Sequence, residues 1–310
     1  MSDRFQRFSQ CRDRSGATRV DRYRQYRMRS RKVLAAPSLF DLFDRNEGRL
    51  MDKWLHYFPI YERHFAPYRG NSPTFLEIGV SHGGSLDMWR QWLGRGTHVI
   101  GIDIDPRCTT LAGRGIDIRI GDQADPDFLD EIIAEFGPFD IVLDDGGHFP
   151  HAQIASLDRL WSAVKPGGVY VVEDTHTNYW PGYDGGLLRP DTFIEHVKPL
   201  VDDLHGFHSQ LPEHQPSEWT HTLGAAHFYD SVVVLDREDR TPPSTRKTGR
   251  PSFDTLYGQQ PHELLTEEHL AEIEAMQQPS RRFRRAMRSP IAALRSLPVR
   301  LRRAVEIRRN

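Results

Sequence analysis

Short apolar runs alternate with segments of helical periodicity along most of the chain, and this alternation constrains the fold more than any other feature. Most of the runs are continuously apolar, which is typical of strands buried on both faces of a parallel sheet. Strands are predicted at 74–79, 98–103, 116–120, 139–144 and 169–173, and helices at 84–93, from Pro106, at 127–136 and at 151–164. A helix over 191–204 precedes two further strands within 225–235, which a tight turn near Asp230 and Ser231 joins. This order predicts an α/β fold with a doubly wound, seven-stranded sheet that ends in a hairpin.

Composition divides the rest of the chain into further segments. Residues 33–70 carry aromatic side chains at helical spacing and are predicted to form a short helical cap over one end of the sheet. A stretch rich in Pro, Ser and Thr follows the last strand and leads into an acidic helical pattern at 263–276. The predicted organisation is a flexible basic tail (1–32), the cap (33–70), the sheet domain (71–236), a linker with an acidic helix (237–280) and a basic amphipathic tail (281–310).

The charge is distributed very unevenly over the 310 residues. The formal net charge is only −2, but residues 1–32 carry a net +8, residues 281–310 a net +10 and the middle a net −20. In 281–310, apolar residues recur at near-helical spacing with arginines between them, as in helices that lie on a membrane surface. We therefore expect peripheral contact between this tail and an anionic membrane, with solvated tails as the alternative. Nucleic acid is an unlikely partner, because aromatic residues for base stacking are almost absent from the tail.

The sequence shows no sign of export. No run of about 18 apolar residues predicts a spanning helix. The N-terminus lacks the apolar core of a secretory signal. Two cysteines, Cys11 and Cys108, cannot build a disulfide framework or a cysteine-type zinc site. We expect a cytoplasmic protein, peripheral at the inner membrane surface if the tail binds there. The oligomeric state stays open, a homo-oligomer included.

A glycine-rich loop follows the first predicted strand, and acidic residues end the next two. Ligands of doubly wound sheets bind beyond the carboxyl ends of the strands. The loop lacks the G-x-G-x-x-G spacing of dinucleotide sites. Asp103 suits the ribose hydroxyls of a ligand and Asp122 its adenine side, although each alone can be an ordinary helix cap. Together, the loop and the two aspartates predict a cofactor that contains adenosine.

Two pairs of adjacent carboxylates end the fourth and fifth strands. Asp144-Asp145-Gly-Gly-His148 follows one strand, and Glu173-Asp174-Thr-His176 follows the other. Neighbouring carboxylates repel one another, and a hard divalent cation such as Mg²⁺ relieves this repulsion. A neutral imidazole at His148 can take a proton from a substrate hydroxyl. In the plainer alternative, Asp144 caps a helix and both histidines are surface residues.

These motifs resemble the S-adenosylmethionine site of class I methyltransferases, which have a Rossmann-like sheet. The two acidic motifs, with Tyr179-Trp180 after the second, are similar to the metal-dependent sugar O-methyltransferases of macrolide biosynthesis, the mycinamicin and demethylmacrocin type, over about residues 50–235. The resemblance implies S-adenosyl-L-methionine and Mg²⁺ as cofactors and His148 as the general base. It implies Asp145, Glu173 and Asp174 as metal ligands. We assign to the cofactor Glu77, Gly79, Gly83, Ser85, Asp103, Asp122 and Asp144.

The resemblance implies an O-methyltransferase that acts on a sugar hydroxyl, in an antibiotic or other secondary-metabolite glycoside or in a glycan. Tyr179, Trp180 and Tyr183 follow the second acidic motif and can stack on a sugar face. One alternative is a nonheme iron oxygenase of the cephalosporin-hydroxylase type, with Asp145, His148 and His176 as its ligands. A non-catalytic adaptor is another, and a catechol-type methyltransferase differs only in its acceptor. Turnover with a methyl donor, without oxygen or iron, would exclude the oxygenase.

Overall fold

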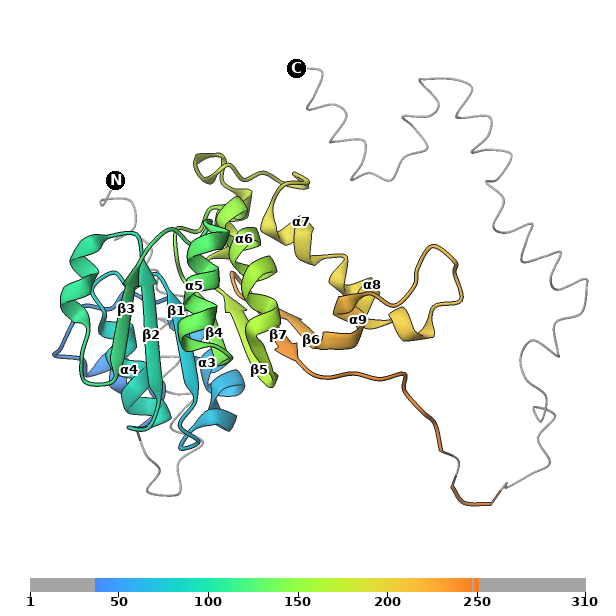
Figure 1. Cartoon of the computed structure of the whole chain (residues 1–310), viewed down its shortest axis with the longest axis horizontal. Coiled ribbons are helices and arrows are strands. Elements are labelled where there is room, and N and C mark those ends of the chain that lie inside the picture. The colour runs from blue at the N-terminus through green and yellow to red at the C-terminus, as the bar shows by residue number, and fades with distance from the viewer. Residues whose placement is uncertain (1–36, 247, 251–310) are drawn as a thin grey trace, which may run out of the picture. The chain divides into compact units, whose positions relative to one another are not determined.

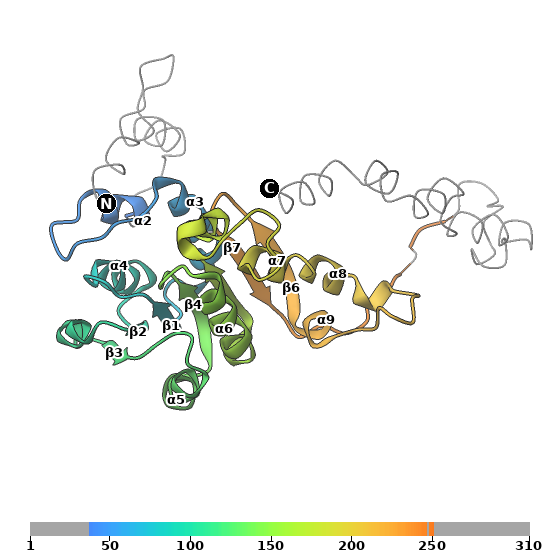
Figure 2. The same cartoon turned by 90° about the horizontal axis from the view of Figure 1, so that it is seen from above.

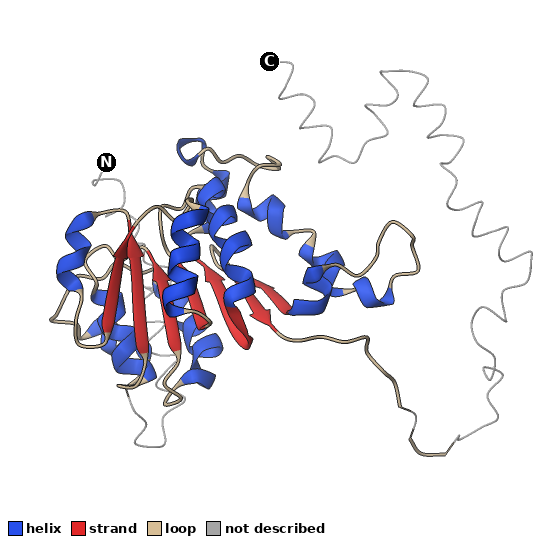
Figure 3. Cartoon of the chain, viewed as in Figure 1, coloured by secondary structure: helices blue, strands red, loops and turns tan. Residues whose placement is uncertain are grey.

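The computed structural model describes residues 37–246 and 248–250, and these contain a seven-stranded sheet (Figures 1 and 3). Its strand order is β3-β2-β1-β4-β5-β7-β6. The first five strands are parallel, and β7 runs antiparallel to both β5 and β6. The strands are β1 (Thr74–Ile78), β2 (His98–Asp103), β3 (Ile116–Ile120), β4 (Phe139–Asp144), β5 (Val164–Val172), β6 (Leu223–Phe228) and β7 (Val233–Arg237). The predicted doubly wound sheet with a terminal hairpin is confirmed.

The chain builds the sheet outward from its middle in two directions, and this fixes where a ligand can bind. It runs from β1 to β2 and β3 on one side, then returns to place β4 on the other side of β1. In parallel sheets the crevice at such a switch point, outside the carboxyl ends of the strands, is the usual ligand site. The loops that follow β1 and β4 therefore face the same crevice.

Helices cover both faces of the sheet, as Figure 2 shows from above. One face packs against α5 (Pro126–Phe136), α6 (Pro150–Leu160), α7 (Phe193–Val197) and α8 (Leu200–Leu204). The other face packs against α2 (Leu39–Asp44), α3 (Phe58–Phe65) and α4 (Gly84–Leu93). A short helix, α9 (Glu218–Thr222), leads directly into β6. The continuous apolar character of the central strands is explained by this burial on both sides.

The aromatic cap packs α3 against a face of the sheet, and its residues Lys53, Tyr57 and Tyr61 also reach the carboxyl ends of β4 and β5. Phe58, Tyr61 and Phe65 on α3 are fully buried and share one core cluster with Phe75 of β1 and Trp89 of α4. Because they are three and four residues apart, these side chains form one stripe along the helix. The stripe is buried against the apolar face of the sheet. The described part of the cap begins at residue 37.

Three expected helices differ in detail. The segment from Pro106 is a 3-10 helix (Pro106–Leu111), and the helix expected over 191–204 is divided into α7 and α8, with Pro199 as the N-cap of α8. Because proline lacks the backbone N–H of a helix interior, it ends one helix and opens the next. The helix expected over 151–164 ends as α6 at Leu160, and β5 begins at Val164. The register of β5 against β4 shifts at this point, so the following Lys-Pro-Gly-Gly stretch is a bulged part of the strand.

The sheet and its helices belong to one compact unit that ends at Pro242. The predicted acidic helix at 263–276 and the basic tails 1–32 and 281–310 lie outside the described residues. Within residues 37–246 and 248–250, no helix combines the length and the apolar character that crossing a bilayer requires.

Candidate active site

Two glycines shape the loop between β1 and α4. Gly79 has φ of +90°, and a Cβ added there would lie 2.0 Å from the carbonyl oxygen of Asp145. Gly83 has φ of +75° and is the left-handed N-cap of α4, which has no side-chain cap. Any other residue would be strained at both positions. The loop therefore lies directly against the loop after β4 and presents the uncapped amides at the start of α4 to the crevice.

The predicted aspartates lie at the ends of β2 and β3. Asp103 Oδ2 accepts hydrogen bonds from the backbone N–H groups of Val80 (2.8 Å) and Ser81 (2.9 Å). Its Oδ1 accepts from the N–H of Asp105 at 2.8 Å. Asp122 is exposed, and its Oδ1 accepts from the N–H of Ala124 at 2.8 Å. Asp103 thus holds the glycine loop in place through these three hydrogen bonds.

Glu77 and Ser85 lie beneath the glycine loop. Glu77 is fully buried, and burial raises the pKa of its carboxyl group to about 7. The Ser85 hydroxyl donates a hydrogen bond to Glu77 Oε2 at 3.1 Å. Glu77 Oε1 lies 3.9 Å from Lys53 Nζ. These two predicted cofactor residues therefore form the floor of the loop.

Asp144 is buried at the end of β4 and is held by groups of the protein itself. Its carboxylate accepts hydrogen bonds from the Ser156 hydroxyl, from Gln123 Nε2 at 3.1 Å and from the Gly146 N–H at 3.3 Å. It does not cap the following helix, because the N-cap of α6 is Phe149. Burial raises the pKa of Asp144. Its assignment to the cofactor stays a prediction, while the structure shows it anchoring the loop after β4.

A buried lysine, which the sequence analysis missed, joins the acidic residues of the site. Lys53 Nζ contacts Asp145 Oδ2 in a short ion pair and lies 3.1 and 3.2 Å from the two carboxylate oxygens of Glu173. Burial alone would lower the pKa of Lys53, but Asp145, Glu173 and Glu77 together raise it well above its ordinary value. Lys53 is therefore charged at neutral pH and neutralises part of the acidic cluster.

Two tyrosines from the cap also reach the acidic residues. The Tyr61 hydroxyl donates to Glu173 Oε1 at 2.6 Å, and the Tyr57 hydroxyl donates to Asp174 Oδ1 at 2.6 Å. Burial, together with these carboxylates, raises the pKa of both tyrosines, so both remain hydrogen-bond donors. The cap thus fixes the orientation of both carboxylates after β5.

His148 is held in a strained backbone conformation beside Asp174. Its φ is +57°, that of Asp174 is +53° and that of Ser81 is +49°. Left-handed backbone at non-glycine residues is costly and tends to occur at functional sites. Here it occurs in each of the loops after β1, β4 and β5. His148 Nε2 lies 3.7 Å from Asp174 Oδ2, and Thr177 Oγ1 donates to the His148 carbonyl oxygen at 2.7 Å.

The three predicted metal ligands lie close together, but Glu173 does not belong to the group of converging ligand atoms that contains Asp145 and Asp174. Asp145, His148 and Asp174 offer ligand atoms that all lie within 4.8 Å of one another. Glu173 adjoins this group and is turned towards Lys53 and Tyr61. Two converging carboxylates suit a hard divalent cation, so Asp145 and Asp174 fit the predicted magnesium site. The assignment of all three ligands stays a prediction.

The ligand set of the alternative oxygenase is not assembled in the residues described. His176 Nδ1 hydrogen-bonds Ser231 Oγ at 3.0 Å and lies 3.9 Å from Asp174 Oδ1. It is not part of the group formed by Asp145, His148 and Asp174. The cluster therefore contains one histidine and two carboxylates, whereas the oxygenase needs two histidines and one carboxylate.

Comparison with known proteins finds methyltransferases among the relatives of the chain. Residues 76–175 match the family model described as a methyltransferase domain. The chain is 39% identical over 220 residues to demethylmacrocin O-methyltransferase of Streptomyces fradiae, which covers 66% of this chain and 54% of that protein. It is 38% identical over 199 residues to mycinamicin VI 2''-O-methyltransferase of Micromonospora griseorubida, over 59% of this chain and 49% of that protein.

A solved structure agrees with these relatives. MycE methyltransferase from the mycinamycin biosynthetic pathway, in complex with Mg and SAH, matches with a TM-score of 0.60 and 34% identity, over 66% of this chain and 55% of that chain. The chain spans about half the length of the relatives it matches. The predicted fold class is confirmed, and so is the resemblance to macrolide sugar O-methyltransferases.

Proposed function

We propose that the chain is an S-adenosylmethionine-dependent O-methyltransferase that methylates a sugar hydroxyl with the help of a divalent cation. The observation that carries this proposal is the convergence of Asp145, His148 and Asp174 beside the glycine loop. The relatives support it, because they are named O-methyltransferases and two of the names specify a rhamnosyl compound as the substrate.

The cofactor would occupy the crevice at the carboxyl ends of β1 and β2. When bound, S-adenosylmethionine supplies a methyl group that its sulfonium already activates. Gly79 and Gly83 let the backbone approach a ligand closely, and Asp103 keeps this loop rigid through three amide hydrogen bonds. The contribution of these residues is therefore to hold the methyl donor in one orientation.

The cation would be held by Asp145 and Asp174, with Glu173 beside them. When bound, Mg²⁺ lowers the pKa of a coordinated hydroxyl. Lys53 and Tyr61 hold the Glu173 carboxylate, and Tyr57 orients Asp174. These contacts come from the cap, so the cap completes the site that β4 and β5 begin.

His148 would remove the proton from the acceptor hydroxyl. Its Nε2 lies 3.7 Å from Asp174 Oδ2, which places the ring beside the carboxylates that would hold the cation. The strained backbone of His148 and the hydrogen bond from Thr177 to its carbonyl oxygen restrict where the ring can lie. General-base catalysis of this kind contributes roughly 10²–10⁴ in rate.

The acceptor would bind against an aromatic surface next to the acidic cluster. Tyr179 and Trp180 are 46% and 38% exposed, which is unusual for large rings. Trp180 packs on His176 with ring centroids 4.6 Å apart, and Tyr183 packs on Phe149 at 5.2 Å. Exposed rings that are held rigidly in this way suit the apolar face of a sugar. We infer a small-molecule glycoside as the acceptor, with a glycan sugar as the alternative.

A methyl-transfer assay on a panel of deoxysugar and rhamnosyl glycosides tests the proposal. The full chain should convert S-adenosylmethionine to S-adenosylhomocysteine with Mg²⁺ and stop when EDTA is added. Asp145→Asn should lose the dependence on Mg²⁺ together with turnover. His98→Ala is a matched control, since His98 pairs with Asp117 at the far edge of the sheet. Full activity of Asp145→Asn in EDTA would contradict the metal assignment.

We also propose that residues 281–310 bring the enzyme to an anionic membrane surface inside the cell. The 11 arginines and single glutamate of this segment support it. The full chain should sediment with vesicles that contain phosphatidylglycerol, and a chain that ends at residue 280 should not. Equal sedimentation of both would overturn this proposal and leave the enzymatic one intact. Analytical ultracentrifugation of the full chain would test for a homo-oligomer.

A further inference from the structure

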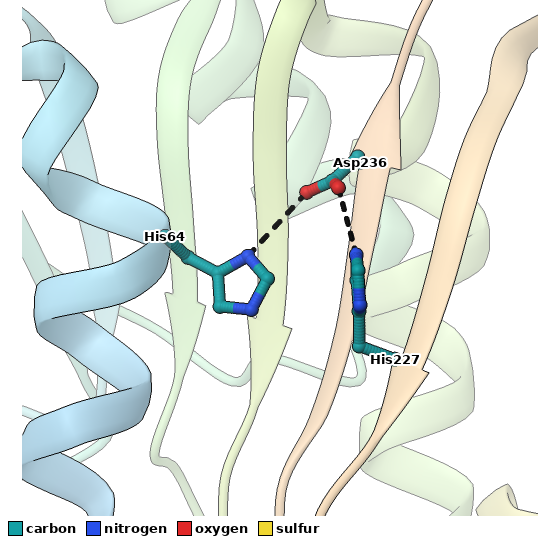
Figure 4. Close-up of side chains that lie close together, drawn as sticks. All are labelled: His64, His227 and Asp236. Carbon is teal, nitrogen blue, oxygen red and sulfur yellow. Dashed lines mark hydrogen bonds and ion pairs between the residues drawn. The ribbon is translucent and has the colours of Figure 1, made fainter.

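A second group of potential ligands lies on the face of the sheet that α3 covers. It consists of His64 on α3, His227 on β6 and Asp236 on β7 (Figure 4). Asp236 pairs with Val169 of β5, three residues before Val172 at the carboxyl end of that strand. Three residues of strand span about 10 Å. The group is therefore separate from the acidic cluster at the carboxyl ends of the strands.

The two histidines face the two oxygens of one carboxylate. His227 Nε2 lies 2.9 Å from Asp236 Oδ2, and His64 Nδ1 lies 3.7 Å from Asp236 Oδ1 (Figure 4). All three ligand atoms lie within 4.8 Å of one another. A tetrahedral ion with bonds of about 2.0–2.1 Å needs its ligands about 3.3 Å apart, which lies inside this range.

The far nitrogen of His64 has its own partner. His64 Nε2 lies 2.9 Å from the Tyr229 hydroxyl, to which Arg63 Nη1 also donates at 3.4 Å. Histidines that bind metals usually have their second nitrogen held in this way, which fixes the ring and its tautomer. In the tautomer with the proton on Nε2, this nitrogen donates to the Tyr229 hydroxyl and the lone pair of His64 Nδ1 is free to bind a metal ion.

The surroundings of Asp236 suit a bound cation. Val169, Val171 and Val234 belong to the apolar cluster on this face. The rings of His64 and His227 have centroids 4.7 Å apart, so one ion can contact both imidazoles and the carboxylate. A divalent ion with two neutral imidazoles and one carboxylate leaves a single net positive charge and satisfies all three groups.

We infer that His64, His227 and Asp236 bind a divalent transition metal of the zinc type. Imidazole nitrogens suit Zn²⁺ and Co²⁺, whereas Mg²⁺ prefers sites made of oxygen. The side chains of His227 and Asp236 are each 35% exposed, so solvent can supply a fourth ligand. The metal fastens α3 to the β6–β7 hairpin. Since α3 also carries Tyr61, the same bond secures the cap against the active site.

Cobalt titration of the metal-free full chain tests the site, because Co²⁺ bound to nitrogen ligands in tetrahedral or five-coordinate geometry absorbs visible light. The titration is made in the Asp145→Asn background, which removes a ligand of the acidic cluster. One equivalent of Co²⁺ should bind, and Zn²⁺ should displace it. His227→Ala should weaken binding at least tenfold, and Asp236→Asn should do the same. His98→Ala should change nothing, because His98 forms a single exposed pair with Asp117.

A second measurement, the Tm with and without Zn²⁺, uses a variant whose fold should be preserved. His227→Gln changes only a partly exposed position on the outermost strand, β6, so its fold should survive. Zn²⁺ should raise the Tm of the Asp145→Asn chain and leave the Tm of the chain that also carries His227→Gln unchanged. Equal cobalt spectra, or equal zinc-induced Tm shifts, with and without the His227 substitution would overturn the proposal. Absence of any cobalt binding by the Asp145→Asn chain would also overturn it.

Discussion

The carboxyl ends of β4 and β5 gather carboxylates around one lysine, whereas the face under α3 gathers two histidines around one carboxylate. In the first cluster Lys53 contacts Asp145 and Glu173 and has Glu77 nearby. In the second, ring nitrogens of His64 and His227 lie 3.7 and 2.9 Å from the two carboxylate oxygens of Asp236. Both clusters join the cap to the sheet, and both draw residues from distant parts of the chain.

The difference in ligand type indicates different ions. Oxygen-rich sites favour Mg²⁺, and mixed nitrogen and oxygen sites favour Zn²⁺ or Co²⁺. The position in the fold differs as well, because only the first cluster lies at the switch point where doubly wound sheets bind ligands. We therefore propose a chemical role for the first cluster and a structural role, holding the cap in place, for the second.

The largest expected effect is a loss of methyl transfer when a residue of the acidic cluster is changed. His148→Ala should reduce methyl transfer by about 10²–10⁴, because it removes the general base. Its affinity for S-adenosylhomocysteine should stay unchanged. The control is His98→Ala, which should retain full activity. A His148→Ala chain with undiminished turnover would show that His148 is not the general base.

Lys53→Met should produce the next largest effect, on stability. The change leaves the buried Glu173 and the partly buried Asp145 without their cation, and breaking a buried ion pair typically costs about 3–5 kcal/mol of unfolding free energy. Mg²⁺ should restore part of the loss, because a bound cation can neutralise the same carboxylates. Urea unfolding with and without Mg²⁺ measures both effects. Lys165→Met is the control, since Lys165 pairs with Asp140 near the surface and should contribute under about 1 kcal/mol.

A pH series tests the burial of Glu77. Its pKa is about 7 in the folded chain and 4.5 ordinarily, so between these values the folded state holds the proton more firmly than the unfolded state. Stability therefore falls as the pH rises from about 4.5 to 7, by an amount on the order of 3 kcal/mol. Glu77→Gln should lose this part of the pH dependence, as measured by Tm between pH 5 and 8. Parallel pH profiles for the two chains would show that Glu77 is ionised throughout.

The smallest expected effect is the loss of stability when an exposed ion pair is removed. Arg159 and Asp130 form a pair whose side chains are 46% and 44% exposed. Arg159→Ala should change the free energy of unfolding by less than about 1 kcal/mol. A larger loss in urea unfolding would mean that charge pairs on the helices contribute as much as those in the two clusters.

The strands were predictable because their apolar runs end in glycine or aspartate. The segments 98–103, 116–120 and 139–144 coincide with β2, β3 and β4. The start of β5 was missed because its first part bulges, with Gly167 at φ of +79°. A local bulge of this kind depends on the register against β4, which the pattern of apolar residues does not encode.

The acidic motifs and His148 were also predictable, since each follows a strand in the same crevice. Lys53 was not, because its partners Asp145 and Glu173 lie 92 and 120 residues away along the chain. Tyr57 and Tyr61 fit the apolar stripe of the cap, and nothing in the sequence indicates that their hydroxyls reach Asp174 and Glu173. Such contacts depend on how the cap docks, which is a property of the tertiary structure.

We propose above all that the glycine loop after β1 and Asp103 form a site for S-adenosylmethionine. Calorimetric titration of the full chain with S-adenosylhomocysteine, with and without Mg²⁺, tests it most directly. We predict that one equivalent binds with micromolar affinity in both conditions. Absence of binding in both conditions would contradict the methyltransferase assignment.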